Sequence, residues 1–226
     1  VATVVEYQQR QRGILRRRQE LRRLRLSPAL TRDGRRVQLL ANIELPADVR
    51  AAVEAHAAGI GLYRTEFLFM NRTGAPSEDE QFRAYTRVAK AMPAKPVTIR
   101  TLDLGADKQV DGGRSLSAPS VNPALGLRAV RLCLHDPGLF RPQLRAILRA
   151  SAFGRVRLMI PMLSSQEELF RVLDLIEETK HSLKRDGEKF NPRIPIGGMI
   201  EVPAAAVTAD LFARRLDFFS FGTNDL

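Results

Sequence analysis

Short apolar runs alternate with segments of helical periodicity along most of the chain. Six runs predict buried strands, at residues 37–43, 59–64, 96–100, 156–162, 194–200 and 218–221. Between them, apolar residues recur at a spacing near 3.6, as along residues 82–92 and 169–183, which predicts helices that each bury one face. Ser77 with Glu80, and Ser164 with Glu167, have the capping-box spacing expected at the start of two of these helices.

This alternation predicts an α/β fold with a parallel sheet. A doubly wound sheet would normally carry a glycine-rich phosphate loop after its first strand, and the ANIELP segment lacks one. We therefore expect a (β/α)8 TIM barrel, truncated after about strand six because two strand–helix units are missing at the C-terminal end. Residues 1–36 are expected to form a linker helix and turn, and residues 37–226 an incomplete barrel domain.

The net charge of +11 is concentrated at the start of the chain. Residues 1–36 hold eleven Arg and three acids, a net +8, so residues 37–226 carry only +3 (25 basic minus 22 acidic). A basic helix can follow nucleic-acid phosphates, but residues 8–25 carry neither interleaved aromatic residues nor a recognition motif. We expect a solvated linker helix and no nucleic-acid partner, with RNA binding through these residues kept as an alternative.

The cellular setting is also read from composition. No apolar stretch approaches the roughly 18–20 residues of a membrane span, so we expect no membrane segment. The single cysteine, Cys133, excludes an intrachain disulfide and fits a reducing, cytoplasmic compartment; its helical spacing predicts a buried packing thiol. Because the first residue is Val, the chain is expected to be a piece of a longer polypeptide.

Five charged residues stand at the ends of the predicted apolar runs or beside them. Arg64 and Arg100 close strands two and three, Arg128 begins the helix after a Gly- and Ser-rich loop at 103–122, and Glu201 and Asp225 close strands five and six. A barrel gathers the carboxyl ends of its strands at one rim. The planar guanidinium group of arginine binds phosphate and carboxylate, and several arginines close together require an anion to balance their charge. Mg²⁺ prefers oxygen ligands, which the two carboxylates could supply.

These residues predict a small, multiply anionic ligand held together with a divalent metal. Taken singly, each arginine could instead form a surface salt bridge, and either acid could cap the following helix. The histidines at 56, 135 and 181 are expected at the surface, and no Ser–His–Asp set, zinc spacing or P-loop is present in the sequence.

Several longer motifs, in order along the chain, carry a family resemblance: GLYRTEFLFMNR, TIRTLDLGADK, NPALGLRAVR, LRAILRASAFG, IPMLSS, IEVPAAA and FFSFGTNDL. Together they resemble the phosphoenolpyruvate-utilising enzymes, and among these enzyme I of the phosphoenolpyruvate-dependent sugar phosphotransferase system (phosphoenolpyruvate–protein phosphotransferase). The resemblance covers essentially all 226 residues. It implies a TIM-barrel domain that binds phosphoenolpyruvate (PEP) and Mg²⁺ and forms a homodimer.

The resemblance also implies roles for individual residues. The matching positions assign PEP binding to Arg64, Arg100, Arg128 and Asn224, and metal binding to Glu201 and Asp225. In this family a phosphohistidine on a separate N-terminal domain accepts the phosphoryl group and passes it to the carrier protein HPr. The family's catalytic acid is a cysteine late in the barrel, beyond residue 226, so we expect no catalytic residue within this fragment. Cys133 does not match it.

Two other readings stay open at this point. The chain could come from pyruvate, phosphate dikinase or phosphoenolpyruvate synthase, which share several of the motifs. It could also be a non-catalytic binding or oligomerisation fragment. The segment does not distinguish sugar uptake from a nitrogen-linked regulatory branch.

Overall fold

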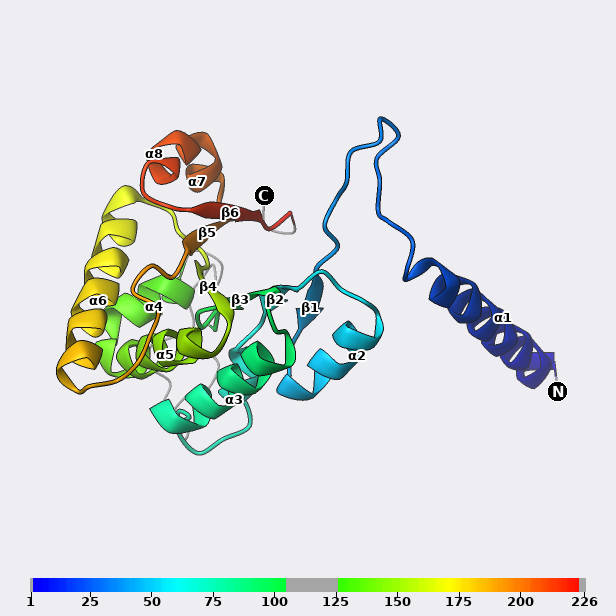
Figure 1. The fold of residues 1–226 in the computed structure, drawn as a ribbon, viewed down its shortest axis with the longest axis horizontal. Helices are drawn as coiled ribbons and strands as arrows, with labels where there is room; N and C mark the ends of the chain where they lie inside the picture. Colours follow the sequence, from blue (N-terminus) through cyan, green and yellow to red (C-terminus); the bar gives the residue numbers. More distant parts are fainter. Residues whose placement is uncertain (1, 105–125, 224–226) are drawn as a thin grey trace.

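The computed structural model describes residues 2–104 and 126–223. They form a six-stranded parallel sheet, in which each strand pairs with the next one along the chain (Figure 1). The strands are β1 (Ala41–Ile43), β2 (Ile60–Tyr63), β3 (Pro96–Arg100), β4 (Arg155–Ile160), β5 (Ile196–Ile200) and β6 (Phe218–Phe221). A doubly wound sheet reverses its strand order, whereas this order runs 1 to 6 without reversal, as in a barrel. The predicted fold, a TIM barrel truncated after about strand six, is confirmed as a curled half-barrel.

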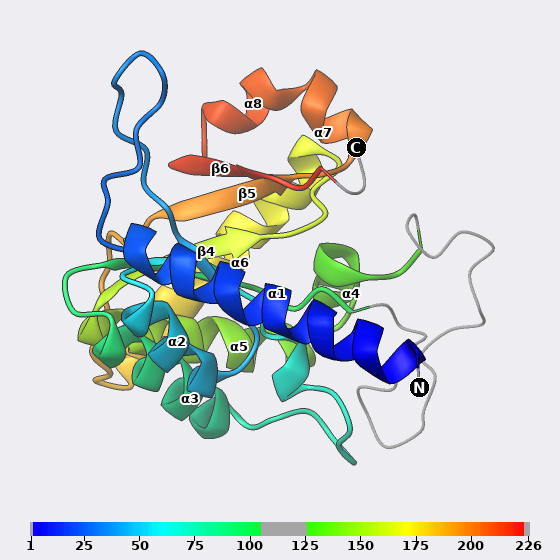
Figure 2. The same ribbon diagram turned by 90° about the vertical axis from the view of Figure 1, so that its right-hand side faces the viewer.

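Helices follow the strands and cover one face of the sheet. They are α2 (Val49–Glu54), α3 (Glu78–Ala91), α4 (Ala129–His135), α5 (Pro137–Ala150), α6 (Gln166–Arg185), α7 (Pro203–Val207) and α8 (Ala209–Ala213), with 3-10 turns at Pro46–Asp48, Glu66–Leu68 and Ser151–Phe153. Helix α3 packs against α5, and α5 against α6 (Figures 1 and 2). The helices do not cover the other, concave face of the curled sheet, where side chains line a cavity.

The two faces of the sheet differ because side chains alternate along each strand. Val97 and Ile99 of β3 belong to the hydrophobic core, together with Leu158 of β4. Thr98 and Arg100, the alternate residues of β3, instead line a cavity on the opposite face. In β3, the apolar residues therefore join the core, and the polar residues between them line the cavity.

Capping boxes start two helices of the half-barrel, α3 and α6. The predicted box of Ser77 and Glu80 is confirmed at α3. The second box is formed by Ser165 and Glu168 rather than by Ser164 and Glu167, so that prediction was wrong by one residue. Ser164 takes part in another way, because its N–H and hydroxyl both donate to the Glu168 carboxylate, at 2.7 and 2.8 Å.

The first strand is shorter than the apolar run predicts. Val37 and Leu39 are 45% and 65% exposed, and β1 begins only at Ala41. The N–H of Val37 donates to the carbonyl of Ala29 in the preceding turn and not to a strand. The prediction of a buried strand over residues 37–40 rested on their apolar character alone and was wrong, because they are exposed and precede the strand.

Other boundaries moved by smaller amounts. The sequence also predicts a helix over residues 46–58 (PADVRAAVEAHAA). In the structure α2 ends at Glu54, and His56 then takes a φ of 57°, which a helix cannot continue through. The loop predicted at 103–122 lies almost wholly outside the described residues. Cys133 is 1% exposed on α4, which confirms the predicted packing thiol, and burial raises the pKa of that thiol.

The first helix, α1 (Ala2–Leu24), stands apart from the half-barrel, and an extended segment connects the two (Figure 1). A bridge between Leu30 and Arg36 closes the turn in that segment, where Gly34 has a φ of 82°. The predicted N-terminal helix is confirmed, while the domain boundary at residue 36 stays a prediction. No helix in the described ranges is both long and apolar enough to cross a bilayer.

Candidate functional site

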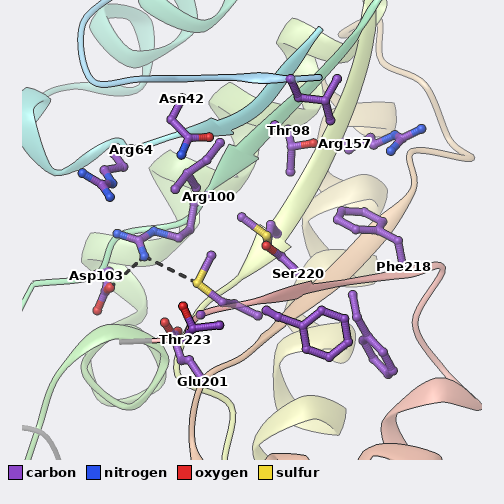
Figure 3. A pocket seen from close by; sticks show the side chains of 18 residues that line it. Asn42, Arg64, Thr98, Arg100, Asp103, Arg157, Glu201, Phe218, Ser220 and Thr223 are labelled. Carbon is purple, nitrogen blue, oxygen red and sulfur yellow. Dashed lines mark hydrogen bonds and ion pairs between the residues drawn. The ribbon is translucent and has the colours of Figure 1, made fainter. Parts of the chain in front are cut away.

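A cavity of about 460 Å³ lies on the concave face of the sheet (Figure 3). Three of the predicted site residues line it: Arg64 after β2, Arg100 at the end of β3 and Glu201 after β5. The remaining polar lining comes from Asn42, Thr98, Asp103, Arg157, Ser220 and Thr223. In Figure 3, Arg64, Arg100 and Asp103 lie near one another, and Arg157 lies apart from them, with its guanidinium 5.6 Å from the ring centroid of Phe218.

Arg100 is the most buried of the predicted cations, with 11% of its side chain exposed. Its Nη2 donates to Glu66 Oε1 at 2.9 Å, and its Nη1 forms an ion pair with Asp103 Oδ2 at 3.0 Å. Nη1 also lies 3.7 Å from the sulfur of Met199 on β5. A guanidinium that is removed from water requires such charged partners, and the two carboxylates fix the direction of its fork.

Arg128 and Arg64 flank this centre on different elements. Arg128 precedes α4 and donates to Asp103 Oδ1 at 2.9 Å, so Asp103 joins it to Arg100, although Arg128 itself does not line the cavity. Arg64 pairs with Glu44 at 2.9 Å, and both side chains are more than two-fifths exposed. Exposed pairs of this kind contribute little to stability, which leaves Arg64 able to exchange its partner.

Two of these arginines keep a hydrogen-bond donor without an acceptor. Arg100 Nε and Arg128 Nε are buried and have no hydrogen-bond partner among the described residues. A buried donor without an acceptor costs about 1–3 kcal/mol. An anion that accepted from either atom would remove that cost.

Glu201 sits where β5 and β6 end side by side. It is 4% exposed, and its Oε1 accepts the N–H of Met162 at 2.7 Å. The N–H of Gly222 donates to the carbonyl of Ile200, and a Cβ at Gly222 would lie 2.9 Å from Glu201 Oε2. The chain leading toward Asn224 and Asp225 therefore passes close against this carboxylate; both of those residues lie outside the described ranges.

Backbone strain is found beside two of the site residues. Ala129, which follows Arg128, has a φ of 49°, and Met162, the donor to Glu201, has a φ of 56°. Residues other than glycine rarely adopt this region, and such strain gathers at functional sites. Both strained residues are buried, so packing holds the two backbone positions.

The three histidines are exposed, as expected, and none of them lines the cavity. Within residues 2–104 and 126–223, no three His, Cys, Asp or Glu side chains are grouped so that they could hold a metal ion by themselves. On the β5–β6 side of the cavity, Glu201 offers a buried carboxylate. Mg²⁺ commonly takes one or two carboxylates plus ligand phosphate oxygens and water, and this donor chemistry fits such a mixed site.

Comparison with known families decides what kind of domain this is. Residues 18–226 match the model of the PEP-binding domain of PEP-utilising enzymes. The chain belongs to this family. The resemblance read from the motifs is therefore confirmed, and the half-barrel is the part of a PEP-binding domain that residues 41–221 build.

Curated relatives of this PEP-binding domain carry a more specific name. The chain is 51% identical to a phosphoenolpyruvate-protein phosphotransferase of Cupriavidus necator over 98% of its own length. It is 47% identical to one from Staphylococcus carnosus over 99%, and 45% identical to one from Staphylococcus epidermidis. The chain spans only 38–39% of the length of these proteins.

Sequence reasoning missed the acidic residues that pair with the arginines of this PEP-binding domain. It took the gathered arginines as cations that require an external anion, whereas Glu44, Glu66 and Asp103 already balance them. The signal was present, because Glu66 and Asp103 follow the ends of strands two and three by only a few residues. The need for an anion is therefore carried by the two buried Nε donors rather than by net charge.

Proposed function

We propose that this chain is the PEP- and Mg²⁺-binding part of an enzyme that transfers the phosphoryl group of PEP to a protein histidine. The observation that carries this proposal is Arg100, a buried guanidinium at the end of a barrel strand with an Nε that has no acceptor among the described residues. It lies in a chain that belongs to the PEP-utilising family. The shared name of the relatives favours the phosphotransferase over the dikinase and synthase alternatives.

The residues have distinct parts in this proposal. Arg64, Arg100 and Arg128 bind the phosphate and carboxylate of PEP, and Asn224 contributes a further contact to the phosphoryl group. Glu201 and Asp225 hold Mg²⁺, which when bound neutralises charge on the phosphoryl oxygens. Phosphoryl transfer depends on alignment and charge neutralisation more than on covalent chemistry by the protein, and fixed arginine forks supply both.

The acceptor and the partners lie outside residues 1–226 in this proposal. The exposed histidines at 56, 135 and 181 do not line the cavity, so the acceptor histidine is expected on a separate domain, which would pass the phosphoryl group to an HPr-type carrier. The family's late cysteine is expected in the rest of the barrel, beyond residue 226. We further propose a cytoplasmic homodimer, and no phosphoryl transfer by this chain alone.

The test is PEP binding to the full-length protein, measured by calorimetry with Mg²⁺ present. Losing a charge-assisted contact in Arg100→Ala should weaken binding by about 2–4 kcal/mol. Arg141→Ala is the matched control, because Arg141 pairs with Glu178 on the helical face and is 45% exposed. Equal affinity of Arg100→Ala and the unchanged protein would overturn the assigned pocket.

A further inference from the structure

A buried glutamine on the helical face reaches the loops that follow β2 and β3. Gln143 of α5 is 1% exposed. Its Oε1 accepts the N–H of Leu102 at 2.9 Å, and its Nε2 donates to Thr65 Oγ1 at 3.1 Å. Leu102 adjoins Asp103, and Thr65 lies between Arg64 and Glu66. One side chain, outside the cavity lining, therefore holds both loops by hydrogen bonds.

The two loops are also joined directly on the cavity side of Gln143. Thr65 Oγ1 donates to the carbonyl of Arg100 at 2.9 Å. Glu66 Oε1 accepts from both Arg100 Nη2 and the N–H of Asp103, at 2.9 and 3.1 Å. Because Thr65 uses its hydroxyl hydrogen on Arg100, its oxygen needs an external donor, and Gln143 supplies it.

A second branch of the network fixes which way the Gln143 amide points. Nε2 of Gln143 also donates to the Tyr85 hydroxyl at 3.2 Å, and that hydroxyl donates to Gln81 Oε1 at 3.0 Å. Gln81 in turn donates from Nε2 to the carbonyl of Pro76. Both hydrogens of the Gln143 amide and its oxygen are thus used, so a flipped amide would place N–H against N–H at Leu102.

We propose that Gln143 is a positioning residue for the anion-binding arginines. It acts through Thr65 and Leu102 to hold Glu66 and Asp103, the two carboxylates that set the direction of the Arg100 fork. The effect on ligand binding rests on the proposed function; the effect on the loops does not. Gln143 lies outside the cavity lining, so removing its amide should loosen the geometry and leave the charges of the site intact.

The test compares variants in the full-length protein. Gln143→Met keeps the volume and removes the three hydrogen bonds; PEP with Mg²⁺ should bind at least about tenfold more weakly. Gln81→Met is the matched control, since it breaks the outer end of the same buried network, where Gln81 bonds to Tyr85 and to the carbonyl of Pro76. Its melting temperature should fall comparably, while its PEP affinity stays within about threefold. Thr65→Val should resemble Gln143→Met, and Thr65→Ser, which keeps the hydroxyl, should bind like the unchanged protein.

Hydrogen exchange of the ligand-free protein gives a readout that does not depend on PEP. In Gln143→Met the amides of residues 65–69 and 102–104 should exchange at least about tenfold faster, whereas Gln81→Met should leave them near their original rates. Unchanged exchange in residues 65–69 would overturn the positioning role, as would equal PEP affinity of Gln143→Met and Gln81→Met. If the unchanged protein fails to bind PEP, the proposed function fails, and the exchange rates alone decide the role of Gln143.

Discussion

Arg100 and Glu66 form an ion pair across the ends of β3 and β2, with Nη2 and Oε1 2.9 Å apart and only 11% and 9% of their side chains exposed. The same carboxylate oxygen accepts the N–H of Asp103. Glu66 thus fixes a side chain and a backbone position in the neighbouring loop. The pair explains how a cation can stay at a buried strand end before any ligand arrives.

Removing this carboxylate should destabilise the fold. Glu66→Ala leaves Arg100 with Asp103 as its remaining carboxylate, and breaking a buried pair from one side costs about 3–5 kcal/mol in the free energy of unfolding. Glu66→Gln should cost less, because an amide oxygen can still accept both hydrogen bonds. Urea unfolding measures both. Glu178→Gln, which breaks the exposed pair with Arg141, is the control and should change the free energy by no more than about 1 kcal/mol. A Glu66→Ala variant as stable as this control would show that the buried pair contributes nothing.

Glu201 should matter for metal-dependent binding rather than for folding. In Glu201→Gln an amide oxygen can still accept the N–H of Met162, so the melting temperature should move by only about 2–4 °C or less. The lost charge should weaken PEP binding in Mg²⁺ by at least tenfold, about 1.4 kcal/mol. Calorimetry with Mg²⁺ and then with EDTA distinguishes a loss of affinity that depends on the metal from one that does not. The assignment fails if the variant shows the same deficit with and without metal.

The strand order and the positions of Arg64, Arg100 and Glu201 were predictable from the sequence, because apolar runs of strand length and the charges that end them are local signals. Residues 37–40 were misassigned since exposure depends on what the rest of the fold places beside them. Glu66 and Asp103 were overlooked for a different reason. Their importance arises only when the ends of β2 and β3 lie side by side, a contact across more than thirty residues that no local pattern encodes. Gln143 was overlooked for the same reason. In the sequence it is one polar residue in an amphipathic helix, and its contacts with Thr65 and Leu102 arise only in the fold.

The start of α3 should make a measurable contribution to acid sensitivity. A hydrogen bond from Arg72, and then one from the Ser77 backbone, lower the pKa of Glu80 below its ordinary value of 4.5. A lowered folded-state pKa means that the contribution is fully present above the unfolded value and is lost as pH falls through the folded one. The stability difference between the unchanged protein and Glu80→Gln should therefore be constant from pH 7 to about 5 and shrink below 4.5. Urea unfolding across this range checks it, and a difference independent of pH would contradict the assigned ion pair.

Cys133 should behave as an inert core residue in the folded protein. Burial, with smaller contributions from Asp136 and Asp103, raises the pKa of its thiol, so little thiolate forms at pH 8 and no reagent reaches it without local opening. Short iodoacetamide pulses followed by peptide mapping should show Cys133 modified at least about a hundredfold more slowly than in unfolded protein. Sub-denaturing urea should accelerate the reaction, because opening of α4 then limits the rate. Rapid modification of the native protein would mean that α4 is not packed against α5 and α6 in solution, and the position of Arg128 at its start would have to be reconsidered.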